Sequence, residues 1–413
     1  MKTMYINNDV KTNYKVVEFL KPQIIYIPIN NGDINLKKGD YVYKGDVITT
    51  DLNDFPIHTS VSGYVTNKIT KINKDGEDQV YIMIENDFKE KYRIDSGYQK
   101  NISNYTKDEF ITLLHECGII GLSGSNIKTY KKYSKNVNYL IVNAVECEPC
   151  CFCDKLVINK YTEKILECID AIIEINKIKY AVIAVKENDP QSIGELSKYI
   201  GSYPKIKIVK VPDRYPIGYD KFLIEYIFGK KVGNLAEKKG IVVNNVSTIL
   251  AIHDVLKYCR PLTERIISIT GNGIKREVNV KAKIGSSLQE IISNVTEYKK
   301  NKKLLFIVNG SMRGKGLPTD DVVVSKDLKS VLVVENKYYK TSNCINCGKC
   351  AEVCPSKIYP SLIMKNVDDP KKINILHPDK CINCGLCSYV CPSKIELNEY
   401  IQIAKRKKEN DEF

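Results

Sequence analysis

Cys344-Ile-Asn-Cys347-Gly-Lys-Cys350-Ala-Glu-Val-Cys354-Pro355 recurs almost unchanged as Cys381-Ile-Asn-Cys384-Gly-Leu-Cys387-Ser-Tyr-Val-Cys391-Pro392. This spacing, C-x2-C-x2-C-x3-C-P written twice, is typical of modules that hold two [4Fe–4S] clusters, in which each run lends its fourth cysteine to the other cluster. We therefore expect one cluster on Cys344, Cys347, Cys350 and Cys391, and the other on Cys381, Cys384, Cys387 and Cys354. Zinc or disulfides are the alternative, but zinc pairs are usually set further apart and lack the following proline.

The bulk composition bounds the remaining possibilities. With 413 residues the chain is long enough for roughly three domains. No apolar run approaches the roughly 18 residues of a membrane span, and residues 1–14 do not resemble a signal peptide, so we expect a cytoplasmic protein with reduced thiols. The net charge is +14, but the lysines are scattered, which argues against nucleic acid. The basic tail Lys405–Lys408 leaves peripheral membrane association open.

The sequence pattern changes three times, which predicts four domains, at residues 15–95, 104–258, 263–330 and 340–405. The first segment carries short β-type runs separated by turns such as Lys44-Gly45-Asp46. These runs are Ile24–Ile29, Tyr41–Val42, Val47–Thr50, Gly63–Ile69 and Val80–Ile84. Its phrase from Lys38 to Val65 resembles the barrel-sandwich fold of lipoyl and biotinyl carriers. The stretch 51–56 lacks the lysine that those carriers modify, so we expect a scaffold without a swinging arm.

The second segment alternates between strand and helix patterns, which predicts a largely parallel sheet with helices on both faces. Its expected strands are Asn138–Val145, Tyr180–Val185, Ile206–Val211 and Ile241–Val243, and Ile165, Ile169, Ile172 and Ile173 mark the apolar face of a helix. Sheets of this kind bind ligands at the carboxyl ends of their strands. The third segment predicts a small α+β unit with strands Arg265–Thr270 and Leu304–Val308 around a helix at Leu288–Val295.

Three loops of the second segment are candidates for a redox-cofactor site. Gly118, Gly121 and Gly124 are spaced so that backbone amides can approach a phosphate, although a turn with positive φ is the commoner explanation. Glu146 and Glu148 follow a predicted strand, where acids often simply face water. Asn244, Asn245 and Thr248 open a helix, either as caps or as phosphate ligands.

The same three loops, in the same order, resemble the flavin- and NADH-site segments of the respiratory complex I 51-kDa subunit family. Over residues 20–405 the chain is similar to the C subunit of the Rnf electron-transport complex and its soluble relatives, through phrases such as Tyr215-Pro-Ile-Gly218 and Gly310-Ser-Met-Arg-Gly-Lys-Gly-Leu-Pro318. The resemblance implies a multidomain α/β protein: a barrel-sandwich β domain, a 51-kDa-like α/β FMN/NADH domain, a β-grasp-like SLBB domain and a ferredoxin-like module with two [4Fe–4S] clusters. The cofactor-binding residues that it implies are Gly121, Gly124, Thr129, Lys132, Glu146, Glu148, Asn244, Asn245 and Thr248.

Two stretches depart from the family pattern. The family's glycine loop usually reads G-G-A-G-F-P-T, whereas this chain has Ser123-Gly-Ser-Asn126-Ile-Lys-Thr129, in which Asn126 replaces a glycine more readily than most residues do at positive φ. After Glu146, Cys150 and Cys151 are additional to the family-like Cys147 and Cys153. We consider Cys147, Cys150 and Cys151 as redox thiols, with small buried apolar residues as the alternative. Cys117, Cys168 and Cys259 lie in helical patterns and are expected in the core.

Three functions are consistent with the sequence. The first is an electron-transfer protein that takes electrons from NADH, with FMN as the intermediate carrier, and delivers them through two clusters to a redox partner such as proline reductase. The second is the peripheral C subunit of a membrane Rnf complex, an ion-translocating NADH:ferredoxin oxidoreductase. The third is a docking scaffold whose clusters relay electrons without a nucleotide.

Overall fold

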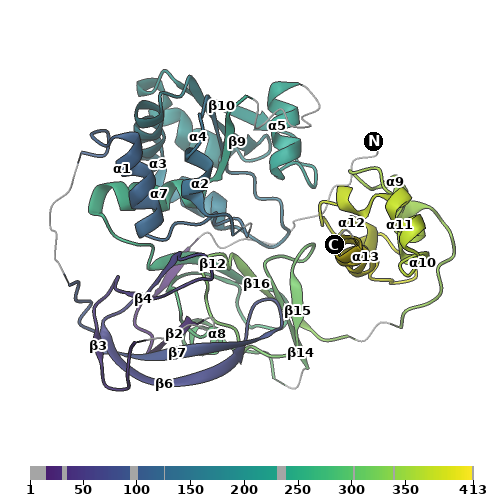
Figure 1. Ribbon diagram of the computed structural model, residues 1–413, viewed down its shortest axis with the longest axis horizontal. Helices are drawn as coiled ribbons and strands as arrows, with labels where there is room; N and C mark the ends of the chain where they lie inside the picture. Colours follow the sequence, from purple (N-terminus) through teal and green to yellow (C-terminus); the bar gives the residue numbers. More distant parts are fainter. Residues whose placement is uncertain are drawn as a thin grey trace.

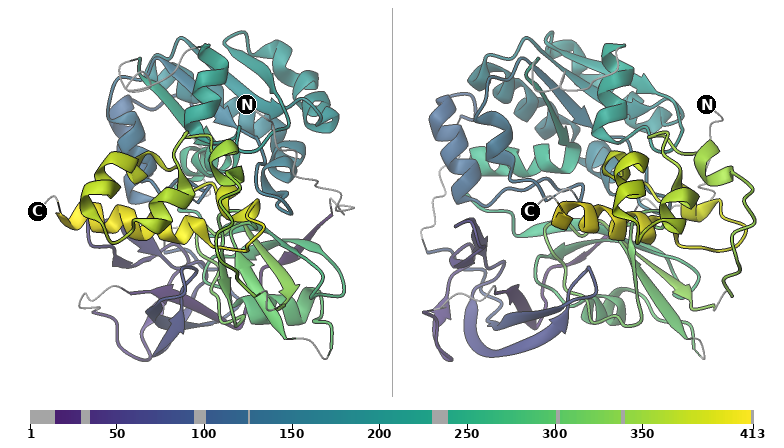
Figure 2. Two further views of the ribbon diagram at one scale, coloured as in Figure 1. Left: turned by 90° about the vertical axis from the view of Figure 1, so that its right-hand side faces the viewer. Right: turned by 45° about the vertical axis from the view of Figure 1, so that its right-hand side comes forward.

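The computed structural model describes residues 15–29, 35–93, 101–124, 126–229, 239–300, 303–337 and 340–411. Figure 1 shows an α/β domain above two β-rich units, with a small helical module beside them. In Figure 2 this module lies in front of the junction between the α/β domain and the β-rich units. This placement brings the second cysteine run against Cys147 of one candidate loop.

The first unit is an antiparallel β structure with a hairpin that reaches toward the α/β domain. Its strands are β2 (Ile24–Pro28), β3 (Tyr41–Val42), β4 (Val47–Thr50), β5 (Pro56–His58), β6 (Gly63–Ile72) and β7 (Asp78–Asn86), in a sheet of order β2-β7-β6-β3 and a β4–β5 pair. Alternate residues of β2 are buried, because one face of the sheet packs on the core and the other is less covered. From the hairpin, the Asp51 carboxylate pairs with Lys128 at 2.9 Å, and the Phe55 ring stacks on Tyr130.

The α/β domain has the predicted parallel sheet, in the order β10-β9-β8-β11. Its strands are β8 (Tyr139–Asn143), β9 (Tyr180–Lys186), β10 (Ile206–Val211) and β11 (Ile241–Asn245), and its helices are α1 (Lys107–Glu116), α2 (Thr129–Tyr133), α3 (Cys153–Asn176), α4 (Pro190–Tyr199), α5 (Asp220–Phe228) and α7 (Val246–Tyr258). Separate apolar clusters cover the two faces, as expected for strands buried on both sides. The four isoleucines of the predicted helix face in α3 are fully buried. Cys259 was predicted in the core but is exposed, because it lies just beyond the last turn of α7 in a left-handed conformation.

The third unit is a mixed six-stranded sheet of order β1-β13-β12-β16-β14-β15. It contains β1 (Val16–Phe19), β12 (Glu264–Thr270), β13 (Val278–Lys283), β14 (Leu304–Val308), β15 (Lys315–Leu317), β16 (Ser330–Glu335) and the helix α8 (Leu288–Val295). The strand β1 links the first segment of the chain to the third unit. Val16–Phe19 falls within the predicted first domain but pairs in parallel with β13, about 260 residues later, and a pairing so distant leaves no local signal.

The fourth unit is a compact module of short helices around the two cysteine runs. It contains α9 (Lys349–Glu352), α10 (Pro360–Lys365), α11 (Pro370–Leu376), α12 (Leu386–Tyr389) and α13 (Leu397–Asp411). Its apolar core includes Cys350 and Cys387 together with isoleucines such as Ile363 and Ile401. None of the helices in the described part of the chain has the length and hydrophobicity needed to span a bilayer.

Candidate functional site

The three candidate loops meet at the carboxyl edge of the parallel sheet. The Lys132 ammonium of α2 donates to the backbone carbonyl of Val243 at 2.7 Å and to the side-chain oxygen of Asn244 at 3.3 Å. The Leu122 amide of the glycine loop donates to the Thr248 hydroxyl at 3.0 Å. These contacts join segments more than 100 residues apart into one site.

The glycine loop has room for a ligand. Gly124 has φ +90°, and a Cβ at this position would meet nothing within 4 Å. Asn126 adopts φ 52°, so it occupies the conformation for which a glycine is usually required. The Ser123 side chain is exposed, whereas the Thr129 hydroxyl is buried without a hydrogen-bond partner. An unpaired buried hydroxyl is costly, and a ligand that accepts a hydrogen bond from it would relieve this cost.

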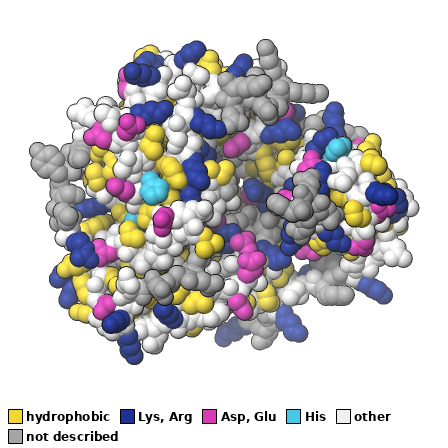
Figure 3. Space-filling view, viewed as in Figure 1, with side chains coloured by type: hydrophobic (Ala, Val, Ile, Leu, Met, Phe, Trp, Pro, Cys, Tyr) yellow, Lys and Arg dark blue, Asp and Glu magenta, His cyan; other side chains and the backbone are white. Residues whose placement is uncertain are grey.

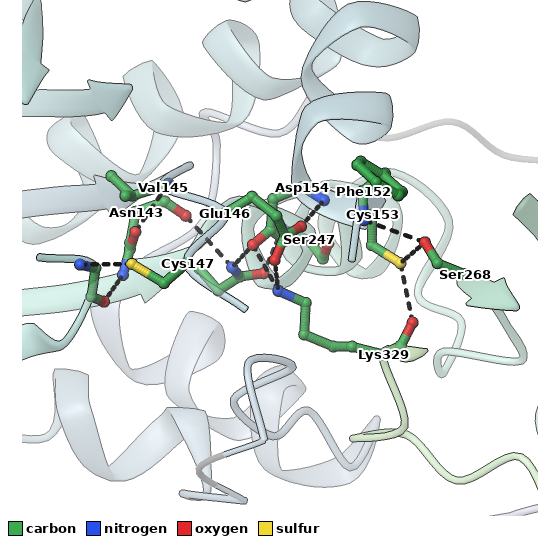
Figure 4. Close-up of polar contacts among 12 residues, drawn as sticks. Asn143, Val145, Glu146, Cys147, Phe152, Cys153, Asp154, Ser247, Ser268 and Lys329 are labelled. Atoms are coloured by element: carbon green, nitrogen blue, oxygen red, sulfur yellow. Dashed lines mark hydrogen bonds and ion pairs between the residues drawn. The ribbon is translucent and has the colours of Figure 1, made fainter. Parts of the chain in front are cut away.

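A buried ion triad ties the α/β domain to the third unit (Figure 4). The Lys329 ammonium lies 3.0 Å from a Glu146 oxygen and 2.7 Å from an Asp154 oxygen. Asp154 also accepts a hydrogen bond from Asn245 at 2.9 Å. Burial by itself would raise the pKa of Glu146, but the Lys329 charge holds it below the usual range. The triad thus fixes Glu146 and Asn245, two of the predicted site residues, relative to each other.

Glu148 reaches the loop between β14 and β15. One carboxylate oxygen accepts a hydrogen bond from the Met312 amide at 3.1 Å, and the other oxygen is buried without a partner. A Cβ at Gly310 would overlap this carboxylate, so the close approach requires glycine there. Burial raises the pKa of Glu148 to about 7.

The four thiols that follow Glu146 occupy different environments. The Cys147 sulfur accepts a hydrogen bond from the Gly218 amide at 2.9 Å, and burial raises its pKa to about 12. Burial also raises the pKa of Cys150, while a hydrogen bond to Cys153 and burial raise that of Cys151. The hydrogen bond with Cys151 lowers the pKa of Cys153, which is not among the predicted redox thiols. Raised pKa values disfavour the reactive thiolate, so the environments of Cys147, Cys150 and Cys151 support the packing interpretation more than redox chemistry.

The second cysteine run encloses a small pocket with the last cysteine of the first run. Cys381, Cys384, Cys387 and Cys354 all line it, together with apolar residues such as Ile358 and Ile401. Burial raises the pKa of Cys387 to about 12, so its thiol must lose a proton when a metal cluster binds. The four thiols that the spacing assigns to one cluster therefore lie together in the fold.

The same run contacts the α/β domain. The Tyr215 hydroxyl donates to the backbone carbonyl of Cys384 at 2.7 Å. Tyr215, Met312, Cys384 and Leu386 form one buried cluster, against which Cys147 and Tyr219 also pack. The predicted cluster ligand Cys384 thus lies beside the residues that follow β8.

A separate cavity of about 260 Å³ lies where the first three units meet. Its lining includes Lys44, Tyr92, Tyr161 and Arg260. Of the predicted site residues, all of which the structure describes, none lines this cavity. The cavity is therefore separate from the predicted cofactor site at the sheet edge.

Comparison with known proteins agrees with this arrangement. Residues 4–89 match the RnfC barrel sandwich hybrid domain, residues 114–254 match the Nuo51 FMN-binding domain, and residues 343–395 match the 4Fe-4S dicluster domain. The C subunit of the ion-translocating oxidoreductase complex of Buchnera aphidicola is 30% identical, over 80% of this chain and 68% of its own length. The chain belongs to the C-subunit family of these complexes.

Other family members match over differing shares of their length. The C subunit of the ion-translocating oxidoreductase complex of Vibrio cholerae serotype O1 is 31% identical over 80% of this chain but 44% of its own, so the chain spans less than half of that relative. The C subunit of the proton-translocating ferredoxin:NAD(+) oxidoreductase complex of Clostridium ljungdahlii is 28% identical over 79% of this chain and 74% of its own. A NAD+-reducing [NiFe]-hydrogenase aligns with a TM-score of 0.51 at 15% identity, over 67% of this chain and 55% of its own, which shows a shared fold.

The family assignment identifies an FMN-binding domain and a 4Fe–4S dicluster domain in this chain. The matched ranges contain all nine predicted cofactor-binding residues and all eight cysteines of the two runs. The open glycine loop, the unpaired Thr129 hydroxyl and the pocket of four thiols fit these two kinds of group.

Sequence reasoning missed three residues that organise the site: Lys329, Asp154 and Tyr215. Lys329 lies in an ordinary polar stretch about 180 residues from its carboxylate partners, so no local pattern marks it. Asp154 opens α3, where an acid is expected for the helix dipole alone. Tyr215 belongs to the family phrase Tyr215–Gly218, and that phrase was the available signal.

Proposed function

We propose that this chain passes electrons from NADH, through FMN held at the sheet edge, to its two [4Fe–4S] clusters and on to a redox partner. The observation that carries the proposal is the contact between Tyr215 and Cys384. It places the second cysteine run against the FMN-binding domain, so electrons released at the sheet edge have a packed route to a cluster.

The proposed cofactor-binding residues have different roles. Gly124 leaves space for the ligand, and Thr129 donates a hydrogen bond to it. Lys132 uses two of its three protons on Val243 and Asn244, which leaves the third for a phosphate. Flavin supplies the conversion of a two-electron donor into single electrons, which iron–sulfur clusters carry.

The thiol ligands follow from the spacing and the fold together. Cys381, Cys384, Cys387 and Cys354 hold the cluster nearer the FMN-binding domain. Cys344, Cys347, Cys350 and Cys391 hold the other cluster. Cys147, Cys150 and Cys151 shape the wall between flavin and cluster, and their raised pKa values keep them protonated.

Two matched glycine substitutions test this route. Gly385 and Gly348 hold equivalent positions in the two runs, at φ +75° and +74°. A Cβ at Gly385 would overlap the Met312 carbonyl, whereas a Cβ at Gly348 would meet nothing within 4 Å. Both substitutions to alanine carry the same left-handed backbone cost of about 1–2 kcal/mol. The difference between them therefore reports the contact with Met312.

The measurement is anaerobic stopped-flow absorbance with NADH and, separately, with dithionite. NADH is expected to bleach flavin and then the clusters in the wild type and in Gly348→Ala. In Gly385→Ala, cluster bleaching by NADH is expected to slow while dithionite still reduces the clusters. A wild type whose clusters respond to dithionite but not to NADH would remove the proposal and favour the nucleotide-free scaffold.

The partner is a separate part of the proposal. The names of the relatives favour another subunit of an ion-translocating complex, with this chain as its peripheral component. The alternative is a soluble cytoplasmic reductase such as proline reductase, which the resemblance to soluble family members suggested. Fractionation of native cells distinguishes them, because co-sedimentation with membranes that high salt releases indicates the membrane complex.

A further inference from the structure

The two cysteine runs have the same local structure but are covered differently. Both begin Cys-Ile-Asn-Cys-Gly, with Asn346 and Asn383 each at φ 55° and four-residue helices, α9 and α12, after the glycines. Equal sequence and backbone give the two loops the same shape. The protein surface that covers one loop therefore indicates what kind of surface the other loop can bind.

The second loop is buried by the rest of this chain. Cys384, Gly385 and Leu386 are all buried, and Leu386 is only 3% exposed. Tyr215 and Met312 pack against them, and the Tyr215 hydroxyl bonds to the Cys384 carbonyl. This loop is thus already a docking face, with protein side chains seated on it.

The first loop is bare among the described residues of the structure. Every residue from Ile345 to Lys349 is exposed, and Ile345 is 66% exposed although its counterpart Ile382 is half-buried. This loop therefore exposes an apolar side chain, Ile345, together with the predicted cluster ligand Cys347.

The charge at this face favours an acidic partner, because its exposed cations Lys349 and Lys365 outnumber the exposed carboxylate of Glu352, which shares α9 with Lys349. Lys349 stands where the second loop has the buried Leu386, so the buried apolar position of one loop is an exposed cation in the other. Lys365 of α10 adds a second exposed cation, whose ammonium donates to the Asn346 side chain at 2.5 Å. Figure 3 shows basic side chains among hydrophobic and acidic ones on the visible face of this module. The chain's net charge of +14 favours an acidic partner as well.

We propose that the loop Cys344–Lys349 is the docking face for an acidic one-electron carrier protein, which exchanges electrons with the cluster of the first run. This rests on the proposed function and adds an order: the second run receives electrons from the FMN-binding domain, and the first run passes them out of the chain. In each exchange the chain loses one electron and the oxidised carrier gains it, and no bond forms or breaks. Ile345 supplies the apolar contact, and Lys349 with Lys365 supplies the charge.

The test is a binding measurement on the full, cluster-loaded chain with an acidic two-cluster ferredoxin as the probe. Biolayer interferometry between oxidised proteins at 50 and 300 mM salt gives the Kd. Lys349→Glu is expected to weaken binding about tenfold at low salt, and high salt is expected to weaken the wild type, because exposed charges are screened. Ile345→Ser is expected to weaken binding several-fold at both salt concentrations.

Matched controls lie on α11 of the same module. Lys371→Glu and Ile375→Ser change an exposed cation and an exposed apolar side chain that are not part of the loop, and they are expected to leave the Kd unchanged. Iron content and the EPR spectrum after dithionite show that each variant keeps both clusters. In stopped-flow experiments, the rate at which the ferredoxin oxidises the dithionite-reduced variants is expected to fall as their Kd rises.

Several results would overturn the proposal. These are an absence of ferredoxin binding, equal binding by the loop and control variants, or a self-association in sedimentation that only Ile345→Ser abolishes. If the wild type floats with vesicles of 30% anionic lipid and Lys349→Glu does not, the face binds a membrane surface instead. Because binding is measured without NADH, failure of the proposed NADH reaction leaves this result intact, and failure of binding leaves the NADH reaction standing.

Discussion

Replacement of Glu148 by glutamine should remove a large pH dependence from the stability of this protein. The carboxyl is buried, one of its oxygens has no partner, and its folded-state pKa is raised to about 7 from the usual 4.5. Burial in a tight space is the main cause, because the charged form loses its hydration there.

The sign and size of this pH dependence follow from the linkage between proton binding and folding. Between pH 4.5 and 7 the folded state holds a proton on Glu148 that the unfolded state has released, so stability falls as the pH rises. The difference between 7 and 4.5, at 1.36 kcal/mol per pKa unit, gives a loss of about 3 kcal/mol. Glutamine stays neutral and avoids this loss. Relative to the wild type, Glu148→Gln should therefore gain about 3 kcal/mol between pH 4.5 and pH 8.

Anaerobic urea unfolding followed by far-ultraviolet circular dichroism, from pH 5 to pH 8, measures this difference. Glu297→Gln is the control, because this carboxylate is exposed and pairs with Lys275 on the surface. The control should follow the wild-type profile. Parallel profiles for Glu148→Gln and the wild type would show that the carboxyl is hydrated and would refute the argument from burial.

Three further predictions concern the cysteines and the ion triad. Cys354→Ser should remove the cluster of the second run and lower iron from about eight to about four per chain. Cys391→Ser should instead remove the cluster of the first run, and EPR of the reduced protein identifies which cluster is lost. Lys329→Met leaves two buried carboxylates without their cation and should lower the unfolding free energy by about 3–5 kcal/mol. Adding Asp154→Asn to this variant should restore part of the loss. A urea midpoint as high as that of the wild type would contradict the triad. Replacing both Cys150 and Cys151 by serine should leave NADH-dependent cluster reduction unchanged. In the wild type, these two thiols should be alkylated more slowly at pH 7 than free cysteine. Fast alkylation in the wild type together with lost turnover in the variant would restore the redox interpretation.

Much of the local structure was predictable from the sequence. The strands Ile206–Val211 and Leu304–Val308 and the helix Leu288–Val295 have the predicted bounds, because breakers flank short apolar runs and the helix buries a face at i, i+3, i+4 and i+7. The glycine-like conformation of Asn126 was also predictable, because Asn126 stands at a glycine position of the family pattern and asparagine adopts positive φ more readily than most residues do. These features depend on interactions between near neighbours in the chain.

The candidate site was predictable as a set of residues but not as an arrangement. Gly124, Thr129 and Asn244 were found because each follows or opens an element at one sheet edge, which parallel topology brings together. Lys329 was not found, since nothing near it in sequence distinguishes it from the other lysines. Its role exists only because the third unit packs against the end of β8.

The sequence by itself indicated the chemistry of the chain: the two cysteine runs specify the kind of cluster, and their spacing predicts its ligands. The tertiary structure alone decided which of the two runs packs against the FMN-binding domain. The two loops share their first five residues but are covered differently, because Tyr215 and Met312 pack on Cys384 while Cys347 stays exposed. Burial depends on the packing of distant segments, so the five shared residues cannot encode which of the two loops is buried and which is exposed.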